Sequence, residues 1–375
     1  MHHGGAELPL RLANGVELHT RPIAARATAA VALWWHAGRL HESPDEVGAA
    51  HLLEHLVCEA LPAAGLARWG GAVNGQSGRE WTVWHALLPA AAAPDFLRTL
   101  VRALRAPLPP DAHIQRESRV LAAEIGAEIG AATVRDHWEH SALRACFGAH
   151  PLARPLAVLP DLDPAGLTAF RARLLTGPRL RVTAAGGLDP DALAAAIRPL
   201  QELPASRAAE PAAPALPTQP CYQRLAAAGA LWLLPFAATE AAAVAELALL
   251  LADPLAGELP RQLRNAAEPL YGLHCELEFC AGIGLWWLRI DAGRVAAVLE
   301  AGIEQRIATG FTAAELARVR ALRHARQILE GEDLLGQLEV LAGARPAPPA
   351  RSASAATLAQ VLAACWQRRC RVLGD

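Results

Sequence analysis

The sequence predicts an α+β protein built from two related domains, and three features of the chain lead to this fold class. Hydrophobic residues make up 53% of the 375 residues, which is typical of a globular chain with an ample core and more than one domain. In the first half, short apolar runs precede segments of helical periodicity. After a proline-rich interruption this order partly repeats, which indicates duplication. Each domain is therefore expected to be a mainly antiparallel sheet covered by helices.

The strands of the first half come early. The runs LPLRL, VELHT and TAAVALWWHAG are short and apolar or alternating, and they are punctuated by Asn-Gly at 14–15 and by Gly38. A helix is expected after the Ser-Pro-Asp turn at 43–45. Two strands, AVNGQS and EWTVWHALLP, should follow. Helical periodicity then runs from about 93 to 145, broken by prolines at 107–110, and LRVTAAGGL is expected to be a closing strand.

A proline- and alanine-rich segment, LPASRAAEPAAPALPTQP at 203–220, lacks any periodic pattern and is typical of a linker. It separates a predicted first domain, 1–202, from a second, 221–375. In the second domain ALWLLPFAA and GIGLWWLRIDA are expected strands, with a long helix ending near Asn265 between them and further helices over 294–343. The strand cores ALWWHAG and GLWWLRI share a pair of tryptophans, which supports the duplication.

Charge and hydropathy exclude several classes of function. The formal net charge is −2, and the basic residues, all arginine, are scattered rather than clustered, so no nucleic-acid partner is expected. The amino terminus lacks the pattern of a secretory signal, which makes the cytoplasm the expected compartment. The most apolar later segment, AAAVAELALLLADPLAGEL, is interrupted by charge and proline, so no membrane span is expected.

The cysteines are expected to be free thiols. Seven is an odd number in a chain without a secretion signal, which argues against a disulfide framework. Cys275 and Cys280 lie in a predicted strand, where their odd spacing directs them to opposite faces. Cys365 and Cys370 flank an arginine-rich segment that we expect to be helical, and they are expected to be incidental there.

The stretch HLLEHL points to a metal. Residues three and four apart share one face of a helix, so His51, Glu54 and His55 should lie together inside an otherwise apolar run. Two histidines one turn apart can chelate a single zinc ion, and catalytic zinc sites use three protein ligands. The glutamate between them is suited to accept a proton from an attacking water. This order, H-x-x-E-H, is the inverzincin signature.

A third ligand must come from elsewhere in the chain. The stretch ESRVLAAEIGAEI, in the predicted helical region, offers Glu117, Glu124 and Glu128. The spacing alone does not choose among these three carboxylates.

Four blocks of the first half together resemble the pitrilysin or insulinase-type zinc metallopeptidases. They are GRLHESPDEVGAAHLLEHL, GGAVNGQSGREWTVWHALLP, ESRVLAAEI and HPLARPL, in the same order and at similar separations as in that family. The first half is also somewhat similar to the peptidase of pyrroloquinoline quinone biosynthesis. The resemblance implies a short, two-domain zinc metallopeptidase with the metallopeptidase clamshell-half fold.

The resemblance also implies roles for individual residues of the first half. The family pattern E-x6-E makes Glu124 the third zinc ligand and Glu117 its support, and it leaves Glu59 and Glu128 as surface charges. The family binds substrate as an added β-strand along an Asn-Ala-x-Thr strand edge. That edge stands here as Asn74, Gly75, Gln76 and Ser77, and the glycine and serine depart from the usual residues.

In the second half, LPRQLRNAAEPLYGL resembles the family's arginine and tyrosine pair, which here is Arg264 and Tyr271. In the family this pair contacts substrate near the scissile bond, where both side chains can donate hydrogen bonds to a developing oxyanion. The implied mechanism is attack by a zinc-polarised water on a peptide carbonyl held along the Asn74 strand. Glu54 carries the proton from that water to the leaving amine.

These residues indicate a zinc endopeptidase that cleaves peptides or small unfolded polypeptides. Maturation of a precursor or leader peptide and general degradation of oligopeptides are both consistent with the sequence. The alternative is a structural or assembly subunit, because the family contains members that keep the fold and lose the site. A metal-binding protein without hydrolytic activity is disfavoured, because it does not need Glu54. The two-domain length further implies a homodimer, or a heterodimer with a related subunit, around one chamber.

Overall fold

The computed structural model describes residues 9–154, 162–225, 228–344 and 352–374, which form two compact units. Unit 1 comprises 1–128, 156–211 and 330–345, and unit 2 comprises 129–155, 212–329 and 346–375. The predicted linker, 203–220, is divided between the two units after residue 211, and the units differ from the predicted ranges 1–202 and 221–375 in two further segments. Residues 129–155 join unit 2 because they continue the long helix α4, and residues 330–345 return to unit 1 as helix α11.

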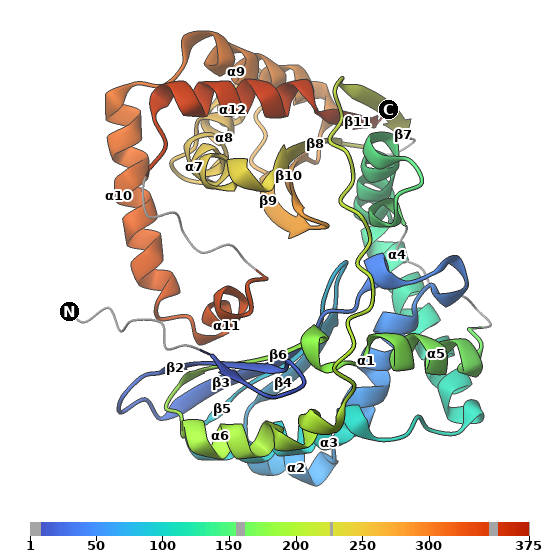
Figure 1. The fold of residues 1–375 in the computed structure, drawn as a ribbon. Coiled ribbons are helices and arrows are strands. Elements are labelled where there is room, and N and C mark those ends of the chain that lie inside the picture. The colour runs from blue at the N-terminus through green and yellow to red at the C-terminus, as the bar shows by residue number, and fades with distance from the viewer. Residues whose placement is uncertain (1–8, 155–161, 226–227, 345–351, 375) are drawn as a thin grey trace. The chain divides into compact units, whose positions relative to one another are not determined.

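Unit 1 is built on a six-stranded sheet in the order β1-β2-β6-β3-β5-β4 (Figure 1). Among the described strands of this sheet only β2 and β6 pair in parallel, and the other neighbours are antiparallel. The sheet is therefore mainly antiparallel, as the sequence predicts. Its strands are β1 (Leu10–Arg11), β2 (Glu17–Pro22), β3 (Thr28–Trp35), β4 (Ala72–Ser77), β5 (Thr82–Pro89) and β6 (Leu180–Gly186).

Strand β3 is buried on both faces, which explains its unbroken apolar sequence TAAVALWW. Alternate residues of a strand point to opposite faces. Val31, Leu33 and Trp35 accordingly join one core, while Ala32 and Trp34 join a smaller core on the other face.

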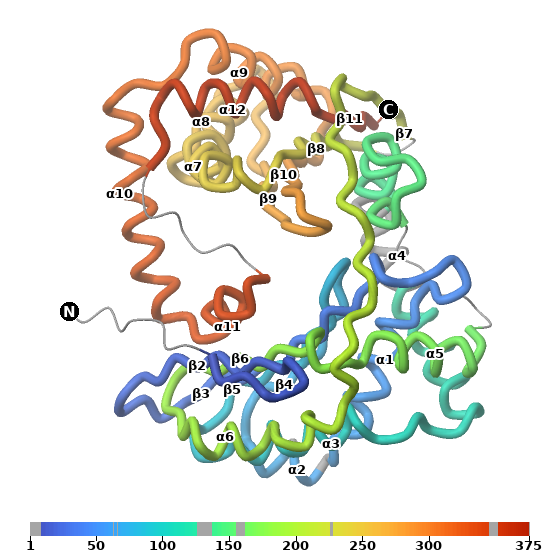
Figure 2. The backbone as a smooth tube through the Cα atoms, viewed as in Figure 1, coloured from blue at the N-terminus to red at the C-terminus, as the bar shows by residue number. Residues whose placement is uncertain are grey.

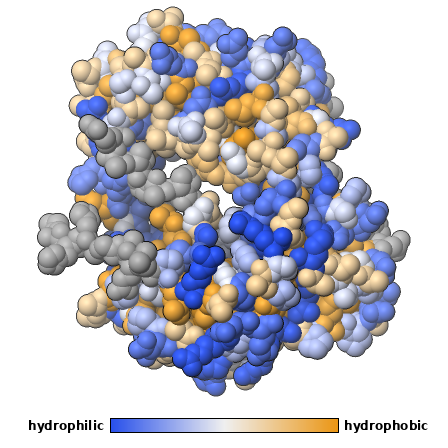
Figure 3. Space-filling view, viewed as in Figure 1, coloured by the Kyte–Doolittle hydropathy of each residue, from blue (hydrophilic) through white to orange (hydrophobic). Residues whose placement is uncertain are grey.

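Helices cover both faces of this sheet. The larger core is closed by α1, α3 and α6. On the face of the molecule seen in Figure 3, hydrophilic and hydrophobic residues are mixed over the surface. The smaller core is closed by α11, whose Leu334, Leu338 and Ala342 pack against β3 and β6. Figure 2 shows the backbone of α11 beside this sheet. Helix α11 thus returns late in the chain to the sheet formed by its beginning. The helices of unit 1 are α1 (Ala49–Glu59), α2 (Ala63–Trp69), α3 (Ala93–Arg105), the first part of α4 (Asp111–Phe147), α5 (Pro164–Leu174), α6 (Pro190–Ile197) and α11 (Leu334–Ala342).

Unit 2 repeats the same sheet topology in five strands, in the order β7-β11-β8-β10-β9. Its one parallel pair, β7 with β11, occupies the place of β2 with β6, and the remaining pairs are antiparallel. The predicted duplication is therefore confirmed at the level of topology. The strands are β7 (Cys221–Leu225), β8 (Ala230–Ala237), β9 (Leu273–Cys280), β10 (Ile283–Ile290) and β11 (Cys370–Gly374).

The shared tryptophans are not equivalent in the two sheets. By topology β3 corresponds to β8, and β10 corresponds to β5. The tryptophans shared by ALWWHAG in β3 and GLWWLRI in β10 therefore do not stand in equivalent strands. Paired tryptophans arise in both places because large apolar side chains suit central strands with two covered faces.

Two further predictions for unit 2 are corrected. The long helix expected to end near Asn265 is two helices, because Pro254 interrupts it and the Asp253 carboxylate accepts hydrogen bonds from the next turn. The segment between Cys365 and Cys370 is only partly helical, because α12 ends at Gln367 and Cys370 begins β11. The helices assigned to unit 2 are the last part of α4, α7 (Ala241–Ala252), α8 (Glu258–Arg264), α9 (Ala296–Thr309), α10 (Ala313–Glu330, its last residue in unit 1) and α12 (Ala355–Gln367).

No helix among the described residues combines the length and the apolar composition that crossing a membrane requires.

Candidate metal centre

The site is built on α1, whose start is fixed by two residues before it. Gly48 adopts a φ of 93°, which glycine tolerates and other residues rarely do. The buried Glu42 carboxylate accepts hydrogen bonds from the backbone N–H groups of Gly48 and Ala50, at 3.1 and 3.0 Å. These contacts satisfy amides at the free end of the helix. They therefore fix the rotation of α1 and the direction of its histidines.

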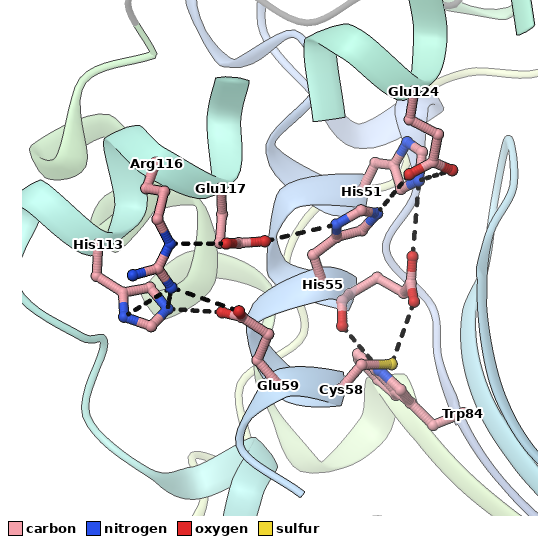
Figure 4. A network of polar contacts seen from close by, with 10 residues as sticks. His51, His55, Cys58, Glu59, Trp84, His113, Arg116, Glu117 and Glu124 are labelled. Atoms are coloured by element: carbon pink, nitrogen blue, oxygen red, sulfur yellow. Dashed lines mark hydrogen bonds and ion pairs between the residues drawn. The ribbon is translucent and has the colours of Figure 1, made fainter. Parts of the chain in front are cut away.

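The two histidines of HLLEHL converge with Glu124 from α4 (Figure 4). The Nε2 atom of His55 lies 3.1 Å from Oε2 of Glu124, and Nε2 of His51 lies 3.9 Å from Oε1 of the same carboxylate. The two imidazole rings are 5.0 Å apart and nearly perpendicular. All three side chains belong to unit 1, so the structure brings together two segments separated by about seventy residues.

These three residues fit a zinc ion. Zinc bonds of about 2.0–2.2 Å in a tetrahedral site hold neighbouring ligand atoms roughly 3.3 Å apart, and the observed separations of 3.1 and 3.9 Å bracket this value. Burial, and then the nearby His55, lower the pKa of His51 to about 4. Its imidazole is therefore neutral at neutral pH, as metal binding requires.

Glu117 lies behind the histidines rather than among the converging atoms. Glu117 is buried, with 5% of the residue exposed. One oxygen of its carboxylate lies 3.9 Å from Nδ1 of His55. The other oxygen contacts Arg116 at 3.3 Å (Figure 4). A carboxylate on the far nitrogen of a histidine is the arrangement that orients metal ligands in proteins.

Glu54 is buried beside the histidines, with Oε2 lying 3.6 Å from Nε2 of His51. Its burial raises the pKa of the carboxyl, and a hydrogen bond from the Cys58 thiol, at 3.3 Å, opposes that shift. Its backbone carbonyl accepts a hydrogen bond from Nε1 of Trp84. A carboxylate with a raised pKa next to a candidate metal is suited to move protons.

Cys58 is a site residue that the sequence interpretation missed. It lies one turn after Glu54 on the same face of α1, so the i, i+4 rule that grouped His51 with His55 also predicts this contact. The i, i+4 spacing of Glu54 and Cys58 was readable in the sequence, but a single cysteine does not by itself indicate a functional site.

Strand β4 carries the residues predicted to bind substrate, and it is the edge strand of the sheet, with β5 as its only partner among the described strands. Asn74 and Gln76 are exposed, while Gly75 and Ser77 face inward and are partly covered. An added Cβ at Gly75 would lie 2.0 Å from Oε1 of Glu54 and 2.8 Å from Sγ of Cys58. The glycine that departs from the family pattern is therefore required by the packing of Glu54 and Cys58 in this chain.

Arg264 and Tyr271 lie together in unit 2. The Arg264 guanidinium carbon is 5.9 Å from the centre of the Tyr271 ring, and its Nη1 donates to the carbonyl of Pro254 at 3.2 Å. Tyr271 is 88% exposed. The pair is thus held as one surface feature by a cation–π contact.

The two glutamates predicted to be surface charges differ in what can be said of them. Glu59 is exposed but engaged, with His113 at 2.6 Å and Arg116 at 3.4 Å (Figure 4). The side chain of Glu128 lies outside the residues whose side chains the structure describes.

Comparisons with known proteins place the first half of the chain among peptidases. Residues 20–158 match the model of the Insulinase (Peptidase family M16) family. The chain carries an insulinase-family domain. An uncharacterized zinc protease of Mycobacterium bovis is 29% identical over 206 residues, which cover 50% of this chain and 45% of that protein. The mitochondrial-processing peptidase subunit beta of Blastocladiella emersonii is 30% identical, over 48% of this chain and 40% of that protein.

The aligned region spans less than half the length of these curated relatives. Two solved structures share the fold over nearly the whole chain. The first half of the periplasmic protease PqqL from Escherichia coli has a TM-score of 0.74 at 18% identity, covering 98% of this chain and 92% of that one. A peptidase M16 inactive domain from Pseudomonas fluorescens has a TM-score of 0.76 at 15% identity, with 97% of each chain covered. The relatives support peptidase function in general, whereas these structures establish the fold alone.

Proposed function

We propose that this chain is a zinc-dependent endopeptidase that cleaves peptides or small unfolded polypeptides. The observation that carries the proposal is the convergence of His51 and His55 with Glu124, beside a buried Glu54 whose carboxylate lies 3.6 Å from Nε2 of His51. His51, His55 and Glu124 hold the metal. Glu117 fixes the ring of His55 through its far nitrogen.

The chemistry is divided between the metal and Glu54. Zinc, when bound, supplies a Lewis acid that polarises the attacking water and the substrate carbonyl. Glu54 accepts a proton from the water and delivers it to the departing amine, a role that its raised pKa favours. Arg264 and Tyr271 donate hydrogen bonds to substrate near the scissile bond, and the exposure of Tyr271 leaves its hydroxyl free for that role.

The substrate binds as an added strand along β4. The outer edge of β4 has backbone N–H and C=O groups with no partner strand among the described residues, and Gly75 brings this backbone close to Glu54. Main-chain pairing tolerates many side chains, so affinity depends on an extended substrate backbone. Peptides N-methylated at alternate residues check this role. Methylation at one set of positions should reduce binding and the other set should not, whereas equal effects at all positions would exclude strand addition.

Two substitutions test the metal and the proton carrier separately. Glu54→Gln should retain zinc and lose peptide cleavage, because Glu54 moves protons and does not bind the metal. The matched control is Glu59→Gln, on the same helix, which should leave cleavage unchanged. Glu124→Gln should lose zinc while Glu128→Gln keeps it. Metal analysis of the purified variants and a peptide-cleavage assay with chelator controls decide between these outcomes.

The rival function is that of a structural or assembly subunit. The fold is shared with an M16 domain described as inactive, and one relative is a subunit of a processing peptidase. Such a subunit would bind its partner without cleaving peptide. Chelator-sensitive cleavage that disappears in Glu54→Gln would reject this reading, and zinc binding without cleavage, alone or with added partner, would favour it.

Maturation of a precursor peptide is the finer form of the proposal. An edge strand that binds substrate mainly through its backbone suits the trimming of an extended leader peptide. It suits the general degradation of oligopeptides equally. Cleavage-site mapping on a mixture of unfolded peptides separates the two. A maturation enzyme should cut few sites, whereas a degradative enzyme should cut many.

A further inference from the structure

Three cysteines gather in unit 2, and none of them belongs to the candidate zinc site. Cys146 lies in the last turn of α4, Cys221 begins β7 and Cys370 begins β11. Their sulfur atoms all lie within 4.8 Å of one another, and those of Cys146 and Cys221 are 3.9 Å apart. Figures 1 and 2 show the end of α4 beside β7 and β11, close to the carboxyl terminus.

The fold accounts for this convergence. Strands β7 and β11 pair in parallel with Cys221 directly opposite Cys370. Paired residues of neighbouring strands present their side chains on the same face of a sheet, so both thiols point to one side. The last turn of α4 supplies the third thiol from that side. Three segments far apart in the sequence thus meet at one point.

We propose that Cys146, Cys221 and Cys370 form a binding site for a thiophilic d10 metal ion, Zn(II) or Cu(I), coordinated by three thiolates. Thiolates are the ligands that both ions prefer. An ion bound to three sulfurs at about 2.3 Å holds them roughly 3.8–4.0 Å apart, and the measured pair is at 3.9 Å. Little movement is needed to close the site around an ion.

Two other properties of the cluster suit a cation. Cys146 and Cys221 are only partly buried, so an ion can enter from solvent, while Cys370 is fully buried and holds the base of the site. Cys146 stands at the carboxyl end of a helix, where the helix dipole favours positive charge.

The test uses the full-length chain with its zinc site disabled by His51→Gln and His55→Gln, reduced and kept anaerobic. Titration with Cd(II) should give one ion per chain and a thiolate-to-metal charge-transfer absorption band. Cys221→Ser in this background should abolish the band. The matched control is Cys275→Ser in the same unit, whose partly buried thiol accepts from Trp286 and stands outside the cluster.

Competition of Zn(II) and of Cu(I) against chelators of known affinity then identifies the preferred ion. The proposal is supported if the protein binds either ion and the Cys221→Ser variant does not. Circular dichroism of the metal-free variants checks that each is folded. If Cys221→Ser does not fold, Cys146→Ser is used in its place. Absence of the band in a folded protein whose thiols are all reduced would overturn the proposal. So would a band that survives in both cysteine variants.

Discussion

At the scale of single residues, the contact of Gly75 with Glu54 joins the substrate strand to the proton carrier. A side chain at position 75 would occupy space that the Glu54 carboxylate and the Cys58 thiol now fill. The side chain of Glu54 is buried and hydrogen-bonded to Cys58, so it has little freedom to move aside. The backbone of β4 therefore sets the position of the Glu54 carboxylate.

We predict that Gly75→Ala keeps zinc and lowers kcat by about a hundredfold, because a displacement of about 1 Å at a reacting group has an effect of this size. The control is Gly78→Ala, where the added Cβ meets only the backbone oxygen of Trp81, at 3.3 Å. Steady-state kinetics and metal analysis of both variants check the prediction. Unchanged kcat in Gly75→Ala would mean that Glu54 acts from a different position.

The sequence predicts some of these residues and not others, for a physical reason. The spacing of His51, Glu54 and His55 on one helix face follows from helical geometry, so it is readable from the sequence. Glu124 lies on another helix, and local spacing carries no information on which carboxylate will reach across, so only the family resemblance selected it. The cysteine cluster joins residues 146, 221 and 370 through sheet pairing, which no local pattern encodes.

At the scale of elements, the segment that leaves unit 1 is anchored by Glu210. Its carboxylate lies 3.0 Å from Nε2 of His41, 3.4 Å from Nδ1 of His36 and 3.0 Å from Arg179. Nδ1 of His41 accepts a hydrogen bond from the amide of Gly38, so the neutral ring carries its proton on Nε2 and donates it to Glu210. The predicted linker is thus bound to unit 1 at this point.

Acidification should weaken this anchor. Burial alone would raise the pKa of Glu210, but His36, His41 and Arg179 more than offset it, so the pKa lies below its ordinary value. Burial lowers the pKa of His36, to about 4, and of His41. The carboxylate contributes stability that is lost as pH falls through its lowered pKa. The contribution of the neutral histidines is lost at a higher pH than that of the carboxylate. It begins to fall below about pH 6.5, where the histidines of the unfolded chain take up protons.

We predict that Glu210→Gln lowers the free energy of unfolding at pH 7 by about 2 kcal/mol, because the buried Arg179 loses its anion while Glu210 itself is one-third exposed. The difference from the native chain should shrink on acidification. Glu202→Gln is the control, because the Glu202 pair with Arg105 is largely exposed and should change stability by less than about 0.5 kcal/mol. Urea denaturation at several pH values measures both variants, and an equal loss in the two would contradict the anchoring role.

Element types can be predicted from sequence where the pattern is strong, as in the unbroken apolar run of β3 and the helical period of α3. The prediction fails where long-range packing decides the element type. Strand β11 is five residues of mixed polarity, and it becomes a strand because β7 and β8 pair with it on both sides. Helix α11 is readable as a helix, but its return to unit 1 depends on a second apolar face of β3. An unbroken apolar sequence predicts that both faces of a strand are covered, but it does not predict which elements cover them.

At the scale of the whole molecule, the chain contains one pair of related sheets, and its alignments cover less than half of its curated relatives. The family resemblance implies two such pairs around one chamber. We propose that the second pair comes from a second subunit, either a copy of this chain or a related protein. One chain carries both the proposed zinc ligands and the exposed Tyr271. In a symmetric homodimer, each chain can therefore supply Tyr271 to the proposed zinc site of the other.

We predict that this chain dimerises and that Tyr271 serves the zinc site of its partner subunit. Glu54→Gln and Tyr271→Phe chains should each be inactive alone, whereas an exchanged mixture should recover about a quarter of native activity, because half of the dimers are mixed and each has one intact site. Mass measurement in solution and proof of subunit exchange come first. If Tyr271 serves its own chain, every mixed dimer has two damaged sites and no activity returns. A stable, fully active monomer would reject the dimer itself, and a mixture that stays inactive despite exchange would place both residues in the same subunit's site.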